Sequence, residues 1–131
     1  CAVRTKTGEI ITSVNLDAYV GSNGTCSEPI AIGRAIVEGY EDFDTIVAVR
    51  HPKPTEECQE LKVVSPCGKC RENIVDYAPE MKVILDVRGE VKKTHIKDLI
   101  PLMYHVSAKA HKDHGSARAE SVEQGDIDEK A

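Results

Sequence analysis

Three cysteines and one glutamate have a spacing that suits metal chemistry. Cys26 and Glu28 are two residues apart, and Cys67 and Cys70 follow about forty residues later in a Pro-Cys-x-x-Cys motif. Both groups precede stretches with helical patterning, and a helix N-terminus favours the thiolate form of cysteine through the helix dipole and free backbone N–H groups. Because two helix starts can direct their thiolates at one point, the spacing predicts a zinc site with Cys26, Cys67 and Cys70 as ligands.

Glu28 makes this predicted zinc site a candidate catalytic site. Three protein ligands leave the fourth tetrahedral position open for water. A carboxylate two positions after a ligand can take a proton from that water, without binding the metal, and pass it to a substrate. The combination of Cys-x-Glu and Pro-Cys-x-x-Cys is typical of zinc-dependent nucleobase deaminases, in which the glutamate shuttles protons.

The hydrophobic pattern predicts the elements that hold these residues. Segments 1–3 and 10–15 flank a Gly-containing turn, which indicates an antiparallel hairpin. A loop rich in Gly, Ser and Asn follows over 16–25, and a mostly buried helix, ended by Gly39, is expected after it.

The second half of the pattern predicts a parallel crossover. Apolar runs at 45–49 and 83–87 are typical of buried strands, and a helix is expected between them at about 68–77. A turn at 88–90 leads into a further strand at 91–95, and 96–102 is expected to form a short helix or turn. Five strands with helices between them indicate an α/β protein with a three-layer α/β/α architecture and a five-stranded mixed sheet.

Composition narrows the function classes. The chain has 131 residues, a formal net charge of −5, no Trp and one Phe, which disfavours a nucleic-acid polymer as partner. No run approaches the roughly 20 apolar residues that cross a bilayer, so no membrane association is expected. Five cysteines in a chain without a secretory signal indicate thiols or metal ligands in the cytoplasm rather than disulfides.

Three segments carry a resemblance to a known family. Segments 15–17 (NLD), 25–28 (TCSE) and 65–71 (SPCGKCR) are similar to the cytidine deaminase family, including its blasticidin-S deaminase branch. The resemblance covers residues 1–105, the expected domain, and leaves 106–131 as a charged tail without an assigned function. It implies a cytidine deaminase-like fold, one Zn²⁺ per subunit, a small-molecule nucleoside substrate, a role in pyrimidine salvage, and a homo-oligomer, either a tetramer or a dimer.

The resemblance also implies substrate contacts. An Asn-x-Glu motif binds the ribose in the family, and here Asn15 matches the Asn while Asp17 replaces the Glu with a shorter carboxylate; Ser27 is a further expected contact. The family's Arg after the catalytic Glu is replaced by Pro29, which leaves Arg71 to offset the thiolate charge. The N-terminal helix that the family uses near the pyrimidine is not recognised in this sequence, and we expect it to be missing from the chain.

Two alternative functions remain open at this stage. The same reaction could act on another aminated compound, such as a nucleoside antibiotic. Alternatively, Cys58 could close a four-cysteine site, and the protein would then be a zinc-stabilised binding module. Simpler roles also compete for single residues: Asn15 could make only a turn hydrogen bond, and Cys1 is expected to be an ordinary thiol. The five histidines are expected to lie on the surface: His51, His95, His105, His111 and His114.

Overall fold

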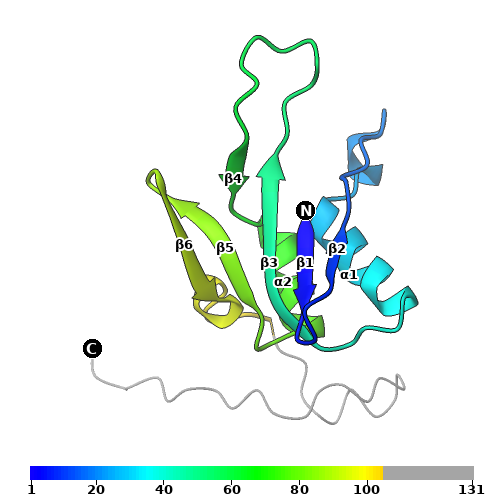
Figure 1. The fold of residues 1–131 in the computed structure, drawn as a ribbon, viewed down its shortest axis with the longest axis vertical. Coiled ribbons are helices and arrows are strands. Elements are labelled where there is room, and N and C mark those ends of the chain that lie inside the picture. The colour runs from blue at the N-terminus through cyan, green and yellow to red at the C-terminus, as the bar shows by residue number, and fades with distance from the viewer. Residues whose placement is uncertain (105–131) are drawn as a thin grey trace. The chain divides into compact units, whose positions relative to one another are not determined.

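A mixed β-sheet organises residues 1–104, the part of the chain that the computed structural model describes. Its main path runs β2-β1-β3-β5-β6, and β4 pairs with β3 off this path (Figure 1). The strands are β1 (Ala2–Thr5), β2 (Ile10–Thr12), β3 (Phe43–Arg50), β4 (Lys62–Val64), β5 (Lys82–Val87) and β6 (Glu90–His95). The helices are η1 (Gly21–Asn23), α1 (Ser27–Val37), α2 (Gly68–Tyr77) and η2 (Ile96–Leu99). Residues 1–101 form one compact unit.

The strand pairing confirms the two hairpins and the crossover that the sequence predicts. β1 and β2 are antiparallel, with Val3 opposite Ile11. β3 and β5 are parallel, with Ile46 opposite Val83, and α2 lies between them in the chain. β5 and β6 are antiparallel around Arg88 and Gly89, which both have positive φ, the backbone that a tight two-residue hairpin turn requires.

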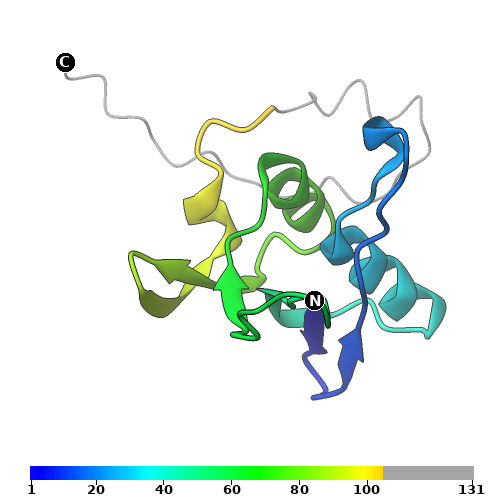
Figure 2. The same cartoon turned by 90° about the horizontal axis from the view of Figure 1, so that it is seen from above.

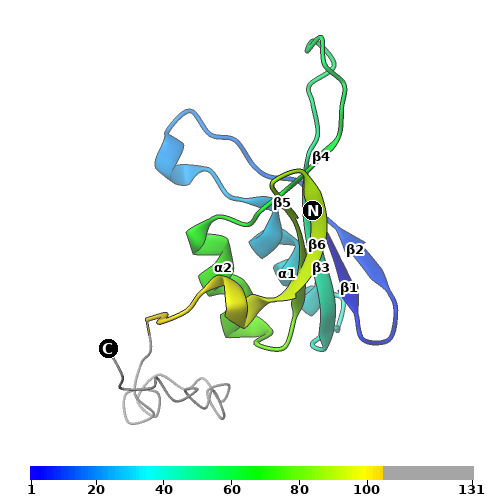
Figure 3. The ribbon, with the colours of Figure 1, turned by 90° about the vertical axis from the view of Figure 1, so that its left-hand side faces the viewer.

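Both α-helices cover one face of the sheet, as Figures 2 and 3 show. Strand residues of this face alternate with residues of the opposite face, so buried side chains recur at every second position in β1 and in the first half of β5. β6 has no buried residue. The fully buried side chains include Val3, Ile32, Ile46, Ile74, Met81, Val83 and Ile96. The mixed α/β fold is therefore confirmed, and its described helical layer is the one that carries the cysteines.

Four details differ from the sequence-based expectations. The first helix is amphipathic rather than mostly buried, because only its sheet-facing side is covered; Val37 on its other side is 88% exposed. β4 was not predicted, because it has three residues and follows a segment with prolines. β2 ends at Thr12 rather than at residue 15. Among residues 1–104, no α-helix forms the second helical layer of the predicted α/β/α arrangement.

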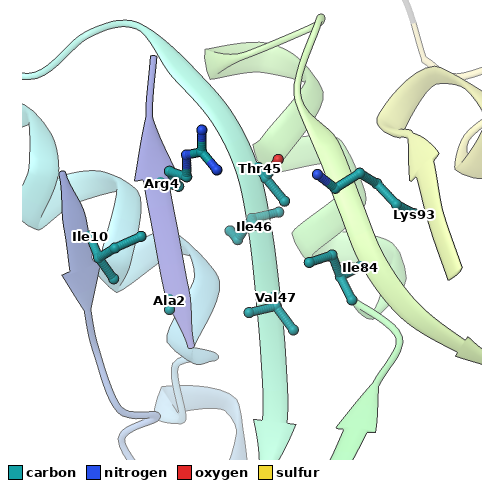
Figure 4. A pocket seen from close by; sticks show the side chains of 8 residues that line it. All are labelled: Ala2, Arg4, Ile10, Thr45, Ile46, Val47, Ile84 and Lys93. Carbon is teal, nitrogen blue, oxygen red and sulfur yellow. The ribbon is translucent and has the colours of Figure 1, made fainter. Parts of the chain in front are cut away.

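The sheet face opposite the helices carries a shallow depression of about 170 Å³ (Figure 4). Its lining comes from five strands and consists of Ala2, Arg4, Ile10, Thr45, Ile46, Val47, Ile84 and Lys93. No cysteine or acidic residue lines it, so the depression is separate from the predicted zinc site.

Two further predictions concern membrane-spanning helices and the C-terminal segment. In the described part of the chain, no helix has the length and apolar character of a transmembrane span. The predicted tail at 106–131 and three of the histidines, His105, His111 and His114, lie outside the described residues.

Candidate metal centre

The structure brings the three predicted zinc ligands together. Cys26 is the N-cap of α1 and Cys67 is the N-cap of α2, while Cys70 lies in the first turn of α2. Their three Sγ atoms lie within 4.8 Å of one another, and the Sγ atoms of Cys26 and Cys67 are 3.8 Å apart. All three cysteines are free thiols. Two helix N-termini therefore converge on one cluster of sulfur atoms.

The local fold explains this convergence. α1 and α2 pack against each other on the same sheet face, so their first turns are neighbours. The start of α1 is also tied to the end of β2, because Ser13 Oγ donates a 2.6 Å hydrogen bond to the carbonyl of Ser27. Ser13 was not predicted as a site residue, because its spacing from the cysteines matches no ligand or capping motif. Its contact forms only when α1 packs beside β2.

Glu28 lies at the same cluster and is only 7% exposed. After burial, the charge of the Glu28 carboxylate is a further cause that raises the pKa of Cys26 and Cys70. Ser27 Oγ donates to Glu28 Oε2 at 3.4 Å, a long hydrogen bond. A buried carboxylate therefore lies at the start of α1, with a long hydrogen bond from its neighbour Ser27.

The pKa values of the three thiols show that crowding and burial disfavour the charged thiolate form at Cys26 and Cys70. Burial, the largest cause, together with the thiols of Cys67 and Cys26 and the charge of Glu28, raises the pKa of Cys70 far above the ordinary range. The backbone N–H of Cys70 donates to the sulfur of Cys67 and lowers the pKa of Cys67. For Cys26, a hydrogen bond with Cys70 lowers the pKa, but burial and repulsion outweigh it, and its net pKa is raised. Three thiolates at this point require a cation to balance their charge.

The sulfur geometry fits zinc. With Zn–S bonds of about 2.3 Å and tetrahedral angles, neighbouring sulfur atoms lie about 3.8 Å apart. The Cys26–Cys67 separation has this value before any ion is added. The donor set of three thiols leaves one coordination position open, which is the arrangement of a catalytic rather than a structural zinc site.

Two of the predicted substrate-contact residues, Asn15 and Asp17, lie on the loop beside the cluster, and the third, Ser27, begins α1. Leu16 and Thr25 form an isolated antiparallel bridge through two backbone hydrogen bonds, so the segment around Leu16 runs next to the residue before Cys26. Asn15 Nδ2 donates to Asp17 Oδ1 at 2.9 Å, and both residues are exposed. The structure thus pairs Asn15 with Asp17 and leaves both accessible.

Arg71 sits directly after Cys70, but its guanidinium binds backbone rather than sulfur. Its Nε donates to the Pro66 carbonyl and its Nη1 donates to the Leu99 carbonyl, both at 2.9 Å. These contacts were not predicted, because one partner is 28 residues away in the sequence.

Among residues 1–104, the other cysteines and histidines do not join the cluster. Cys58 is exposed in the segment between β3 and β4, which extends beyond the sheet in Figure 1. Within residues 1–104, the cluster of possible metal ligands at this site consists of Cys26, Cys67 and Cys70 alone. His51 and His95 are exposed, as predicted for surface histidines.

Comparison with known proteins identifies relatives of this chain. The chain is 55% identical to the blasticidin-S deaminase of Bacillus cereus over 103 residues, which are 79% of this chain and 74% of the relative. It is 27% identical to a probable cytidine deaminase of Dictyostelium discoideum over 123 residues, 92% of this chain and 79% of the relative. No protein-family model matches the chain.

A solved structure agrees with these relationships. The crystal structure of the cytidine deaminase from Bacillus anthracis superimposes with a TM-score of 0.65 at 28% sequence identity, covering 86% of this chain and 76% of that structure. These relatives are named as deaminases, and a mixed sheet with three thiols and a buried carboxylate at two helix N-termini fits a hydrolytic deaminase. The chain belongs to the cytidine deaminase family, which includes the blasticidin-S deaminases.

Proposed function

We propose that this protein is a zinc-dependent deaminase that converts a cytidine-type nucleoside to the uridine-type product. The observation that carries the proposal is the triangle of Cys26, Cys67 and Cys70 sulfur atoms, all within 4.8 Å of one another, beside the buried Glu28. A zinc ion held by these thiols would lower the pKa of water and so supply the nucleophile for hydrolysis. The protein's own residues then bind the nucleoside and move protons.

Glu28 is the proton carrier in this proposal. Water adds to the ring carbon that bears the amino group, the carbon–nitrogen bond breaks, and ammonia leaves as the carbonyl forms. Glu28 accepts a proton from the attacking water and delivers it to the ring nitrogen of the pyrimidine. It then carries the second proton, from the newly added hydroxyl, to the amino nitrogen, which departs as neutral ammonia. The Ser27 hydroxyl, 3.4 Å from Glu28 Oε2, would steady the carboxylate.

Asn15, Asp17 and Ser27 are the proposed substrate contacts. The exposed Asn15–Asp17 pair offers an amide and a carboxylate to the sugar hydroxyls, on a loop that runs beside Cys26. Asp17 has a shorter side chain than the glutamate of the family motif. Pro29 follows Glu28 at the position where the family has an arginine. We therefore assign the positive charge that offsets the thiolates to Arg71, which follows Cys70.

A nucleoside antibiotic is the second candidate substrate. The chain is 55% identical to the Bacillus cereus blasticidin-S deaminase and 27% identical to the probable cytidine deaminase of Dictyostelium discoideum. The higher identity to the blasticidin-S deaminase favours this second candidate. Both candidates use the same proposed residues and release ammonia, so they differ only in the group attached to the cytosine ring.

We also propose that the protein acts as a homo-oligomer, a tetramer or a dimer, in the cytoplasm. The loop next to the cysteine cluster exposes Val14, Leu16, Tyr19 and Val20, each at least 58% exposed. Apolar side chains grouped on one loop are typical of a surface that a second chain covers. Sedimentation of the purified protein measures the number of subunits directly.

An ammonia-release panel tests the proposed reaction. The zinc-loaded protein is assayed with cytidine, deoxycytidine, blasticidin S, adenosine and guanine, and zinc is measured in the same samples. We expect ammonia from cytosine-containing compounds and none from the purines. A zinc-loaded protein that releases no ammonia from any of the cytosine compounds would refute the proposed reaction and favour a zinc-stabilised binding module instead.

A further inference from the structure

The Arg71 side chain lies half-buried between two backbone carbonyls that belong to different parts of the fold. The first is the carbonyl of Pro66, the residue before Cys67, and the second is the carbonyl of Leu99, the last residue of η2. Arg71 therefore links the segment that carries a candidate zinc ligand to an element that contributes no residue to the site.

Arg71 holds the Cys67 segment at two consecutive carbonyls. Its side chain binds the carbonyl of Pro66, and its backbone N–H donates to the carbonyl of Cys67 at 2.9 Å. The ring of Pro66, which is buried, further restricts the backbone there. Together these contacts fix the orientation of the residue from which the Cys67 thiol projects.

The other end of the link is also anchored. Ile96 at the start of η2 is fully buried, and its backbone N–H donates to the Met81 carbonyl at 3.0 Å. Lys97 forms an ion pair with Glu80 on the surface. The Leu99 carbonyl therefore belongs to an element that is anchored to the core through the buried Ile96.

Only arginine can make both contacts. A guanidinium offers several N–H donors in a rigid planar fork, whereas a lysine ammonium is a compact charge on a flexible stem. Lysine at position 71 would keep the positive charge but would not bind both carbonyls from one fixed orientation. Charge compensation and positioning are therefore separable by substitution.

We propose that Arg71 is a positioning residue that holds Cys67 in the zinc-binding geometry by tying it to η2, so that η2 governs metal retention from outside the site. This inference rests on the zinc site of the proposed function. It extends that function, because it assigns metal retention to hydrogen bonds with the carbonyls of Pro66 and Leu99 in addition to the charge near Cys70.

Zinc release to a chromophoric chelator in excess tests the proposal on the folded, zinc-loaded protein. Substitution of residues around metal ligands typically weakens metal affinity about 10–100-fold. We expect Arg71→Lys to release zinc at least about tenfold faster than the wild-type protein. Ile96→Val, which loosens η2 without touching the site, should accelerate release in the same direction.

Ile46→Val is the matched control, because it removes the same methylene from an equally buried isoleucine in β3. It should release zinc at the wild-type rate. A wild-type rate for Arg71→Lys would show that charge alone matters and would overturn the proposal, as would equal rates for Ile96→Val and Ile46→Val. A wild-type protein that holds no zinc would instead refute the proposed function, and this inference with it.

Discussion

Zinc should stabilise the fold strongly, and the loss of one site thiol should remove most of that effect. The three thiols are already close without an ion, with 3.8 Å between the sulfur atoms of Cys26 and Cys67, so binding requires little rearrangement. Because the unfolded chain has no such preformed site, the binding free energy adds to the stability of the folded state.

The expected size follows from mass action. Free zinc at about a thousandfold above its dissociation constant contributes about 4 kcal/mol. The compact unit spans residues 1–101, and for a domain of that size about 1 kcal/mol shifts the melting temperature by about 4–8 °C. We therefore expect zinc to raise the melting temperature of the wild-type protein by about 15–30 °C relative to the chelated protein.

Cys67→Ser and Cys58→Ser form a matched pair for this experiment. Both remove the thiol of an exposed cysteine, but only Cys67 belongs to the cluster. In calorimetry with and without chelator, the zinc-dependent shift should shrink to a few degrees, roughly a quarter or less, in Cys67→Ser and stay at its wild-type size in Cys58→Ser. Equal shifts in the two variants, or no shift in the wild-type protein, would refute the assignment of the site.

Five further substitutions test the stability of the fold that carries the site. Ile32→Ala, which empties a fully buried position of α1, should lower the free energy of unfolding by about 2–5 kcal/mol in urea titrations, whereas Val37→Ala on the exposed side should change it by less than about 0.5 kcal/mol. Gly33→Ala should stabilise the exposed middle of α1 by up to about 1 kcal/mol, whereas Gly39→Ala should destabilise the protein by about the same amount, because Gly39 has positive φ and Gly33 does not. The pKa of Asp44 is lowered mainly by the hydroxyl of the adjacent threonine. The ionised Asp44 therefore stabilises the fold near neutral pH, and this contribution is lost as the pH falls through the lowered pKa. In the same urea titrations, Asp44→Asn should lose less stability between pH 7 and pH 3 than the wild-type protein.

Much of the fold follows from local patterns in the sequence. The runs that became β3 and β5 are continuous and apolar, so their burial and parallel pairing could be predicted. β4 could not be predicted, because it has only three residues and pairs only with the last three residues of β3. The burial of α1 was overestimated, since an apolar residue such as Val37 does not reveal whether a second layer covers it.

The candidate site was predictable to the extent that it depends on residue type and spacing. Cys26, Cys67 and Cys70 were identified because helix starts and chelate spacing can be recognised in a sequence. The hydrogen bonds of Ser13 and Arg71 were not, because each depends on how two distant elements pack. Side chains that position ligands through backbone carbonyls leave no spacing signature.

The proton-carrying role of Glu28 is the central claim, and Glu28→Gln tests it most directly. The substitution keeps the size and burial of the side chain and leaves the three thiols in place. Ammonia release and zinc content should be measured together on a cytosine nucleoside that the wild-type protein deaminates. We predict that zinc content stays at one per chain while the rate falls about 10²–10⁴-fold; wild-type ammonia release from zinc-loaded Glu28→Gln would contradict the account.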